Sequence, residues 1–441
     1  MKARLPAPLF CLLDGSTTMR FPVRCAHGWF ALCLCPLIAP PAWAQYRPGD
    51  KIVVIADATL TVGTTAGDEV WPGLVLQVGD VNGKRLWFSN GKPGWLDQRH
   101  VVPLDRAAID HLSAMIRANP GEDHLYSGRA DVWGALGETD SAIDDLNEAI
   151  RLSPSAAYYS NRGIAWRDNG EYDRAMADYN EALRLDPKYV PAYINRSLAW
   201  HDRGENDRAI VDLNEALRLD PKDAAAYNNR GNAWLEMGEY DRAITDYNEA
   251  LSLAPKFADA HKNRGIAWKN KGENDRAIAD YNEALLLDPK CASAYYNRGN
   301  AWSNKGDYDR AMADYSEALR LSPKHQYYPI FGHLSARQAG DEPASTRFLE
   351  ACGPADGPWP APAVRYLRGE LDEEALLALA NDDDKRTEAR CYFGVVHAVA
   401  GRTRQALVHF QWVRDHGNKG YVEYGIALAE LRRLEAAAKS R

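Results

Sequence analysis

The sequence predicts a mainly α-helical protein in which a solenoid of stacked helical hairpins follows a small all-β domain. Three observations predict this fold class. Proline, tryptophan, glycine and alanine recur every 34 residues through the middle of the 441-residue chain. Each period holds two stretches of helical apolar spacing, separated by a glycine and closed by a proline. Residues 48–104 instead contain short strand-like runs between tight-turn sequences.

The first 44 residues resemble a bacterial secretory signal. Residues 19–24 are short and basic, and residues 28–40 are apolar. Ala42-Trp43-Ala44 then has the small-x-small pattern of a signal peptidase site, so the mature chain would begin at Gln45. Residues 1–18 fit no part of a signal, which points to Met19 as an alternative start. We expect export to the periplasm or the cell exterior; the alternative is a cytoplasmic protein.

Residues 45–104 are expected to form the β domain. The runs 74–78 and 86–88 alternate as strands do, and Asn82-Gly83 and Asn90-Gly91 are hairpin-turn sequences. The order of Gly73, Gly94-Trp95-Leu96 and Val102-Pro103-Leu104 resembles bacterial SH3-like domains. That resemblance implies a small barrel that binds peptidoglycan or short peptides. A ring of exposed aromatic side chains at Trp71, Trp87 and Trp95 would favour this role, and their burial would weaken it.

The repeat unit of residues 224–255 shows how one hairpin is specified. Gly231 and Trp234 lie on one face of the first helix, and Gly231 allows the second helix to approach closely. Gly238 suits the left-handed residue that ends the first helix. Tyr247 lies in the packing stripe of the second helix, and Pro255 stops that helix. A single hairpin cannot bury these faces alone, so stacked neighbours are required.

This unit resembles the tetratricopeptide repeat, with arginine in place of leucine before the glycine and tryptophan in place of the first-helix tyrosine. The resemblance implies a right-handed superhelix that acts as a protein-interaction scaffold, without enzymatic activity or a cofactor. We expect six repeats over residues 122–325, preceded by a leading half-repeat helix at 105–121. A degenerate repeat and linker follow at 326–386, and a degenerate repeat with a capping helix at 387–441.

The C-terminal part carries a second resemblance. Trp359-Pro-Ala-Pro362, a helix expected at Leu371–Ala380, and Tyr424-Gly-Ile-Ala-Leu are similar to the C-terminal part of NlpI-type envelope adaptor lipoproteins. Cys352 and Cys391 could form a disulfide in an oxidising compartment. The alternative is that they are small buried residues, like Cys291.

Composition and motifs exclude several function classes. The net charge of −8, most negative beyond the first 44 residues, disfavours nucleic-acid binding, which draws on many lysine and arginine contacts to phosphate. No apolar run is long enough to span a membrane. The sequence contains no zinc-protease, nucleophile-elbow or phosphate-loop motif. We therefore expect neither catalysis nor a bound metal.

An arginine on the first helix of each repeat is followed sixteen residues later by an aspartate on the second. We interpret each pair as an ion pair within the repeat, worth about 0–1 kcal/mol if exposed. The pairs are Arg129/Asp145, Arg162/Asp178, Arg196/Asp212, Arg230/Asp246, Arg264/Asp280 and Arg298/Asp314.

An asparagine recurs on the first helix, at a position that lines the concave groove in tetratricopeptide superhelices. An amide donates and accepts a hydrogen bond, so this row suits the backbone of an extended peptide. The alternative is that each asparagine bonds a neighbouring helix. Nearby polar positions vary between repeats and are candidates for selectivity. The candidate partner-binding residues are Asn161, Asn195, Asn229, Asn263, Asn297, Lys262, Lys269, Tyr296, Asn232 and Asn300.

The sequence thus predicts a non-enzymatic adaptor of the cell envelope that binds an extended segment of a partner protein in its concave groove. In the alternative interpretation, the SH3-like domain binds peptidoglycan or short peptides, and the solenoid is a spacer or an oligomerisation arm. The partner and the oligomeric state are not specified by the sequence.

Overall fold

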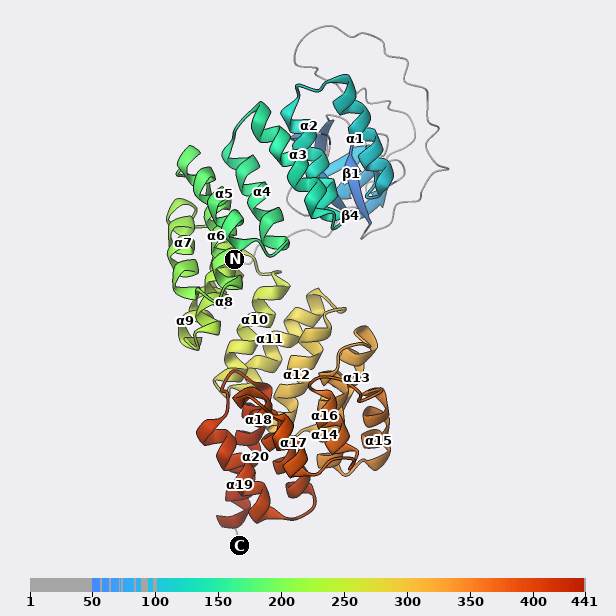
Figure 1. Ribbon diagram of the computed structural model, residues 1–441, viewed down its shortest axis with the longest axis vertical. Helices are drawn as coiled ribbons and strands as arrows, with labels where there is room; N and C mark the ends of the chain where they lie inside the picture. Colours follow the sequence, from blue (N-terminus) through green and yellow to red (C-terminus); the bar gives the residue numbers. More distant parts are fainter. Residues whose placement is uncertain are drawn as a thin grey trace, which may run out of the picture. The chain divides into compact units, whose positions relative to one another are not determined.

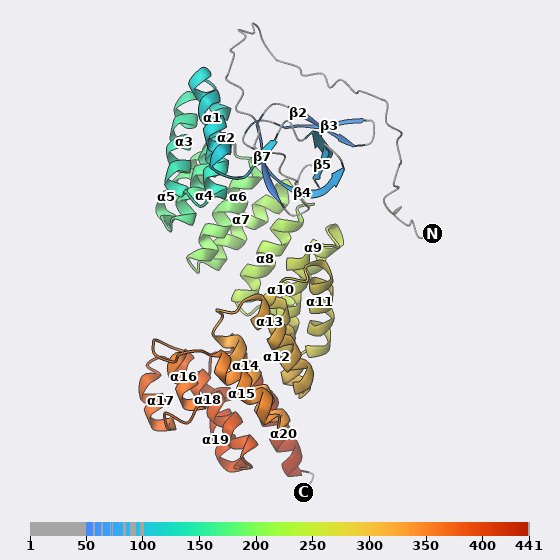
Figure 2. The ribbon, with the colours of Figure 1, turned by 90° about the vertical axis from the view of Figure 1, so that its right-hand side faces the viewer.

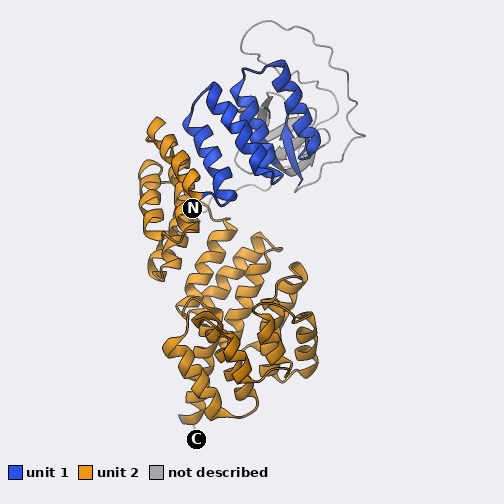
Figure 3. Cartoon of the chain, viewed as in Figure 1, with its two compact units in different colours: residues 1–171 blue, residues 172–441 orange. Residues whose placement is uncertain are grey.

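The computed structural model describes residues 50–55, 58–62, 65–70, 72, 74–82, 85–88, 94–97 and 101–439. The chain divides into two compact units, Met1–Glu171 and Tyr172–Arg441 (Figure 3). The predicted signal segment lies outside the described residues. In the described part of the chain, no helix is both long and apolar enough to cross a membrane.

The described part of the first unit contains an antiparallel sheet of seven strands, followed by four helices (Figure 1). The strand order is β3-β2-β6-β5-β4-β1-β7, and Val53 pairs with Val75 of β4 and Val102 of β7. The described pairings leave β3 and β7 at opposite ends of the sheet, so β-structure is confirmed here, whereas a closed SH3-like barrel stays a prediction. The strands are β1 (Lys51–Val54), β2 (Ala58–Val62), β3 (Thr65–Val70), β4 (Val75–Asn82), β5 (Arg85–Phe88), β6 (Gly94–Asp97) and β7 (Val101–Pro103).

Helix α1 joins this sheet to the first hairpin. Val53 of β1 packs in one buried cluster with Ala108, Leu112 and Val132, so strand and helix share a core. Asp105 caps α1 by accepting a hydrogen bond from the Ala107 N–H at 2.8 Å. The helices of this unit are α1 (Arg106–Ala118), α2 (Asp123–Ala135), α3 (Thr139–Leu152) and α4 (Ala156–Asp168).

Residues 172–439 of the second unit form helices and their connections without strands, and the hairpins follow one another in sequence order (Figure 2). Each consists of a first helix (α6, α8, α10, α12, α14) and a second helix that packs against it. The helices are α5 (Tyr172–Leu185), α6 (Val190–Asp202), α7 (Asn206–Leu219), α8 (Ala224–Glu236), α9 (Tyr240–Leu253), α10 (Ala258–Asn270), α11 (Asn274–Leu287), α12 (Ala292–Lys305), α13 (Tyr308–Leu321), α14 (Tyr327–Ala339), α15 (Glu342–Ala351), α16 (Ala361–Leu367), α17 (Glu373–Leu379), α18 (Asp383–Val399), α19 (Thr403–His416) and α20 (Val422–Lys439).

Glycine determines the geometry of each hairpin in two ways. Gly238 has φ +76°, and the following Glu239 N–H donates to the Trp234 carbonyl oxygen at 2.9 Å, which ends α8. Gly231 lies against the ring of Tyr247, which is fully buried: a Cβ at this position would be 2.6 Å from Tyr247 Cε1. The close approach expected from the sequence is therefore present.

The same glycine–aromatic contact continues beyond residue 325. A Cβ on Gly332 would overlap the Phe348 ring, and one on Gly394 would overlap the Phe410 ring. The hairpins α14–α15 and α18–α19 therefore pack as the regular repeats do, although their sequences have diverged. The domain boundaries proposed from the sequence stay predictions.

The arginine–aspartate pairs are bidentate and more buried than the sequence implied. Arg230 Nε and Nη2 donate to the two carboxylate oxygens of Asp246 at 2.8 and 2.7 Å, and Nη1 reaches Asn214 Oδ1 of the preceding repeat at 2.7 Å. The Asp246 side chain is only 6% exposed. The same bidentate pairing holds for Arg196/Asp212, Arg264/Asp280 and Arg298/Asp314 in this unit and for Arg129/Asp145 in the first, where Nη1 bonds Ser113 instead of an asparagine.

Cys291, Cys352 and Cys391 all carry free thiols. The alternative disulfide between Cys352 and Cys391 is therefore not formed. Burial raises the pKa of Cys391 well above its usual range and that of Cys352 to about 11, so both are protonated, unreactive thiols at neutral pH.

Candidate binding surface

The predicted asparagine row lies on the first helix of each hairpin, and its members differ in what they bond. Asn263 Nδ2 of α10 donates to Asn232 Oδ1 at 2.9 Å and to Asn228 Oδ1 at 3.2 Å, both on α8. Asn232 also accepts from the Tyr247 hydroxyl at 2.8 Å. Asn263 and Asn232 therefore join two neighbouring first helices, which is the alternative that the sequence left open.

The other members of the row are placed differently. Asn229 is partly exposed on α8, and its Oδ1 accepts a 3.4 Å hydrogen bond from Asn228. Asn297 donates to the Ser293 carbonyl oxygen of its own helix at 2.9 Å. Asn195 is partly exposed on α6, and Asn161, on α4, belongs to the first unit.

The C-terminal candidates are covered by the chain itself. Helix α20 packs against α12, and its Ile426, Ala427 and Leu431 belong to the same buried cluster against which Tyr296 packs. Asn300 is fully buried and accepts a hydrogen bond from the Tyr315 hydroxyl at 2.8 Å. Tyr296 and Asn300 are therefore parts of a core and not of an open groove.

The two lysines are also engaged. Lys262 pairs with Asp259, one turn earlier on α10. Burial lowers the pKa of Lys269 to about 8, while the nearby Glu423 of α20 acts in the opposite direction. Lys269 therefore lies near the Glu423 carboxyl at the N-terminal end of α20.

A cluster of buried carboxyl groups anchors that end of α20, and no sequence pattern pointed to it. Glu423 accepts from the Tyr392 hydroxyl at 2.8 Å, and Glu388 accepts from Trp359 Nε1 at 2.7 Å. Burial, reinforced by the negative charge of Glu388, raises the pKa of Glu423 to about 8. Farther along α20, Glu430 accepts from Tyr308 and Gln338. Residues so far apart in the chain share no spacing from which the contact could be predicted.

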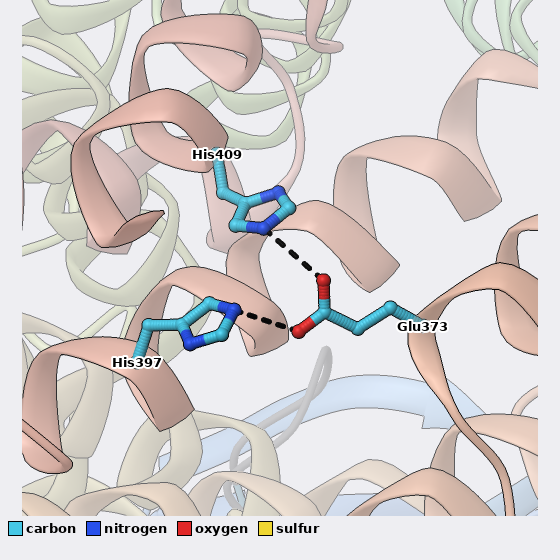
Figure 4. Close-up of side chains that lie close together, drawn as sticks. All are labelled: Glu373, His397 and His409. Atoms are coloured by element: carbon cyan, nitrogen blue, oxygen red, sulfur yellow. Dashed lines mark ion pairs between the residues drawn. The ribbon is translucent and has the colours of Figure 1, made fainter. Parts of the chain in front are cut away.

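Among the residues that the structure describes, one group of side chains has the donor types of a metal site. Glu373, His397 and His409 each offer one ligand atom, and these atoms lie within 4.8 Å of one another (Figure 4). Burial lowers the pKa of His409 to about 4, so its ring is neutral at pH 7. No sequence pattern pointed to these three residues, because they come from separate helices at irregular spacing.

Comparison with known proteins agrees with the repeat geometry. The tetratricopeptide repeat family model matches residues 156–189, 224–257 and 292–325, and a second TPR repeat model matches 198–238 and 269–304. No curated protein matches the chain. The NlpI-type resemblance therefore has no support from these comparisons.

Among solved structures, MamA is 30% identical, over 38% of this chain and 92% of its own length, with a TM-score of 0.34. YrrB, described as a TPR protein with an unusual peptide-binding site, is 23% identical over 42% of this chain and 95% of its own, also with a TM-score of 0.34. PilF of Pseudomonas aeruginosa is 19% identical over 44% and 89%, with a TM-score of 0.41.

Proposed function

Because tetratricopeptide repeat models match five stretches of this chain between residues 156 and 325, we propose that it is a non-enzymatic adaptor that binds an extended segment of a partner protein. Peptide recognition by a solenoid uses a surface formed by successive equivalent positions of the repeats. In the second unit these positions lie on α6, α8 and α10, and we assign the binding surface to their Asn195, Asn229 and neighbouring side chains.

The observation that carries this proposal is the packing of α20 on α12. The first-helix face of α12 is already covered by a segment of the same chain. On α6 and α8, Ile194, Asn195, Asn229 and Leu235 are partly exposed, whereas Ser303, the α12 equivalent of Leu235, is buried. This combination of amides and apolar side chains suits the backbone and the apolar side chains of an extended peptide.

A site-specific photo-crosslinker tests the surface. We expect a crosslinker at position 229 to capture a discrete partner, and mass spectrometry of the product to identify the bound segment. The control places the crosslinker at Val211, which is 66% exposed on the second helix α7. Equal capture at positions 229 and 211, or none at 229, would contradict the assignment.

Paired variants separate binding from structure. We expect Asn195→Ala/Asn229→Ala to lose the captured partner and stay folded by circular dichroism. Asn297→Ala, whose amide bonds its own helix, is the matched control and should keep the partner. We leave Asn263 intact because it joins α8 to α10. A double variant that keeps the partner would contradict this assignment and favour the β domain as the binding site.

We also propose that the protein acts in the bacterial cell envelope. The support is the signal-like sequence of residues 1–44, which lies outside the described structure. N-terminal sequencing of the protein recovered from the periplasm should give Gln45 as the first residue. Recovery of the uncleaved chain from the cytoplasm would overturn this localisation.

A further inference from the structure

Three side chains from three consecutive helices converge at one point of the C-terminal part. Glu373 is the first residue of α17, His397 lies near the end of α18, and His409 lies on α19. His397 Nε2 is 2.7 Å from Glu373 Oε1, and His409 Nε2 is 3.3 Å from Oε2. Figure 4 shows the two Nε2 atoms directed at separate oxygens of the same carboxylate.

The surroundings hold these rings in place. The two imidazoles are stacked, with centroids 5.4 Å apart and planes within 6° of parallel. Phe393 packs edge-on against His409 at 5.3 Å. His397 and His409 are 7% and 8% exposed, whereas the Glu373 side chain is 34% exposed. The group is therefore a rigid, buried pair of nitrogens beside a carboxylate that solvent can reach.

We propose that Glu373, His397 and His409 bind a divalent cation of the zinc class. Two imidazole nitrogens and one carboxylate oxygen are a common zinc ligand set, with a fourth position left for water. Ligand atoms around a tetrahedral zinc ion lie about 3.3 Å apart, given metal–ligand distances of about 2.0–2.2 Å. The present separations, all within 4.8 Å, require only small side-chain rotations to accept an ion.

The same three residues could instead form a hydrogen-bonded cluster, in which each Nε2–H donates to Glu373. The two arrangements place the ring hydrogens differently, because a metal takes the Nε2 lone pair and moves the hydrogen to Nδ1. His397 Nδ1 is buried and has no hydrogen-bond partner among the described residues. Arg390 Nη1 lies 3.4 Å from His409 Nδ1. With a metal bound, Nδ1 would carry a hydrogen, so the Arg390 guanidinium, which also stacks over Trp412 at 5.1 Å, would have to turn away.

A bound ion would connect α17 to the α18–α19 hairpin. Apart from this cluster, the contact of α17 with the hairpin rests on a small apolar group that includes Leu376, Ala389 and Phe393. Coordination by residues of three helices adds a crosslink that exists only in the folded state, so the ion should stabilise this part of the chain.

Zinc titration of the chelator-treated full chain tests the site. We expect one ion per chain and a rise in the thermal midpoint with zinc. His397→Gln and His409→Gln should each weaken binding by about 100-fold or more, since loss of even an outer-shell partner weakens binding by about 10–100-fold. His416→Gln, on the same helix as His409 but outside the cluster, is the matched control and should bind as the wild type does.

Arg390→Gln distinguishes the two arrangements further. It removes a positive charge near the ion and offers an oxygen to the His409 Nδ1–H, so we expect zinc to bind about tenfold more tightly. Zinc binding that is absent, or equal in His397→Gln and the wild type, would overturn the proposal. If the histidine variants do not fold, X-ray absorption of the zinc-loaded wild type decides: we expect two imidazoles and no sulfur, and a sulfur ligand would refute the site.

Discussion

The contact between Gly231 and Tyr247 gives the sharpest prediction about what holds a repeat together. A Cβ at position 231 would lie 2.6–3.0 Å from three atoms of the Tyr247 ring. The ring cannot easily move, because it is fully buried and its hydroxyl donates to Asn232 at 2.8 Å. Gly231→Ala should therefore displace either the ring or the helix.

The chain itself contains this substitution in compensated form. Where the first-helix glycine is replaced, by Ala130 in one repeat and Ser197 in another, the residue sixteen positions later is Leu146 or Leu213 in place of an aromatic ring. A leucine side chain leaves room for the Cβ of alanine or serine, whereas a tyrosine ring does not. Tyr247→Leu should consequently relieve the strain that Gly231→Ala introduces.

The magnitudes follow from two opposing effects. Alanine in a helix interior is more stable than glycine by about 1 kcal/mol. Overpacking a buried site costs about 1–3 kcal/mol. Gly231→Ala should therefore lower the free energy of unfolding by about 1 kcal/mol. At Gly134 of α2, where a Cβ would meet nothing within 4 Å, the same change should raise it by up to about 1 kcal/mol.

Urea unfolding followed by circular dichroism, over the four proteins of the Gly231→Ala and Tyr247→Leu cycle, measures the coupling. We expect the double variant to be more stable than the sum of the single changes predicts, by about 2 kcal/mol. Additive effects, or a Gly231→Ala protein as stable as the wild type, would refute the reasoning that this glycine is required by the ring.

Two further predictions concern buried charge. Asp246→Asn should destabilise the protein by about 2 kcal/mol, because it leaves the half-buried Arg230 without its bidentate partner. In thermal unfolding, this loss of stability should exceed the loss caused by Glu215→Gln, which breaks the exposed pair Arg218/Glu215. Glu423 has a folded-state pKa of about 8, above its usual value, so its contribution is fully present below about pH 4 and is lost as pH rises through 8. The free energy of unfolding of the wild type should therefore fall by on the order of 4 kcal/mol more between pH 5 and pH 8 than that of Glu423→Gln. The same pH dependence in both proteins would contradict the burial of this carboxyl.

The repeats could be predicted from the sequence because their information is local. Gly231, Trp234 and Tyr247 define two helices, a turn and a contact within 34 residues, and the pattern recurs often enough to rule out chance. The pairing of Arg230 with Asp246 followed from the same register. Its burial did not, because the solvent exposure of a side chain also depends on the neighbouring repeat, here through Asn214.

The candidate binding residues were predicted less well, for a physical reason. A repeat pattern shows which positions lie on the first-helix face, but it does not show what covers that face. Asn300 is equivalent in register to Leu198 and Asn232, which are partly exposed, yet it is fully buried. Helix α20, more than 100 residues later in the chain, packs on α12. Contacts made by irregular C-terminal helices leave no period in the sequence.

The packing of α20 on α12 would also set the C-terminal limit of the proposed binding surface in the second unit. Glu423 lies near Lys269 at one end of α20, and Glu430 is held by Tyr308 and Gln338 farther along. Because the carboxyl of Glu423 and the apolar side chains of α20 are buried in the same core as α12 and α14, releasing this helix would expose that core to water. Under the proposed function, we therefore expect a partner to bind on the first-helix face of α6 and α8, where Asn195 and Asn229 are partly exposed. A competing peptide that displaced α20 would have to replace both its apolar contacts and its carboxylates.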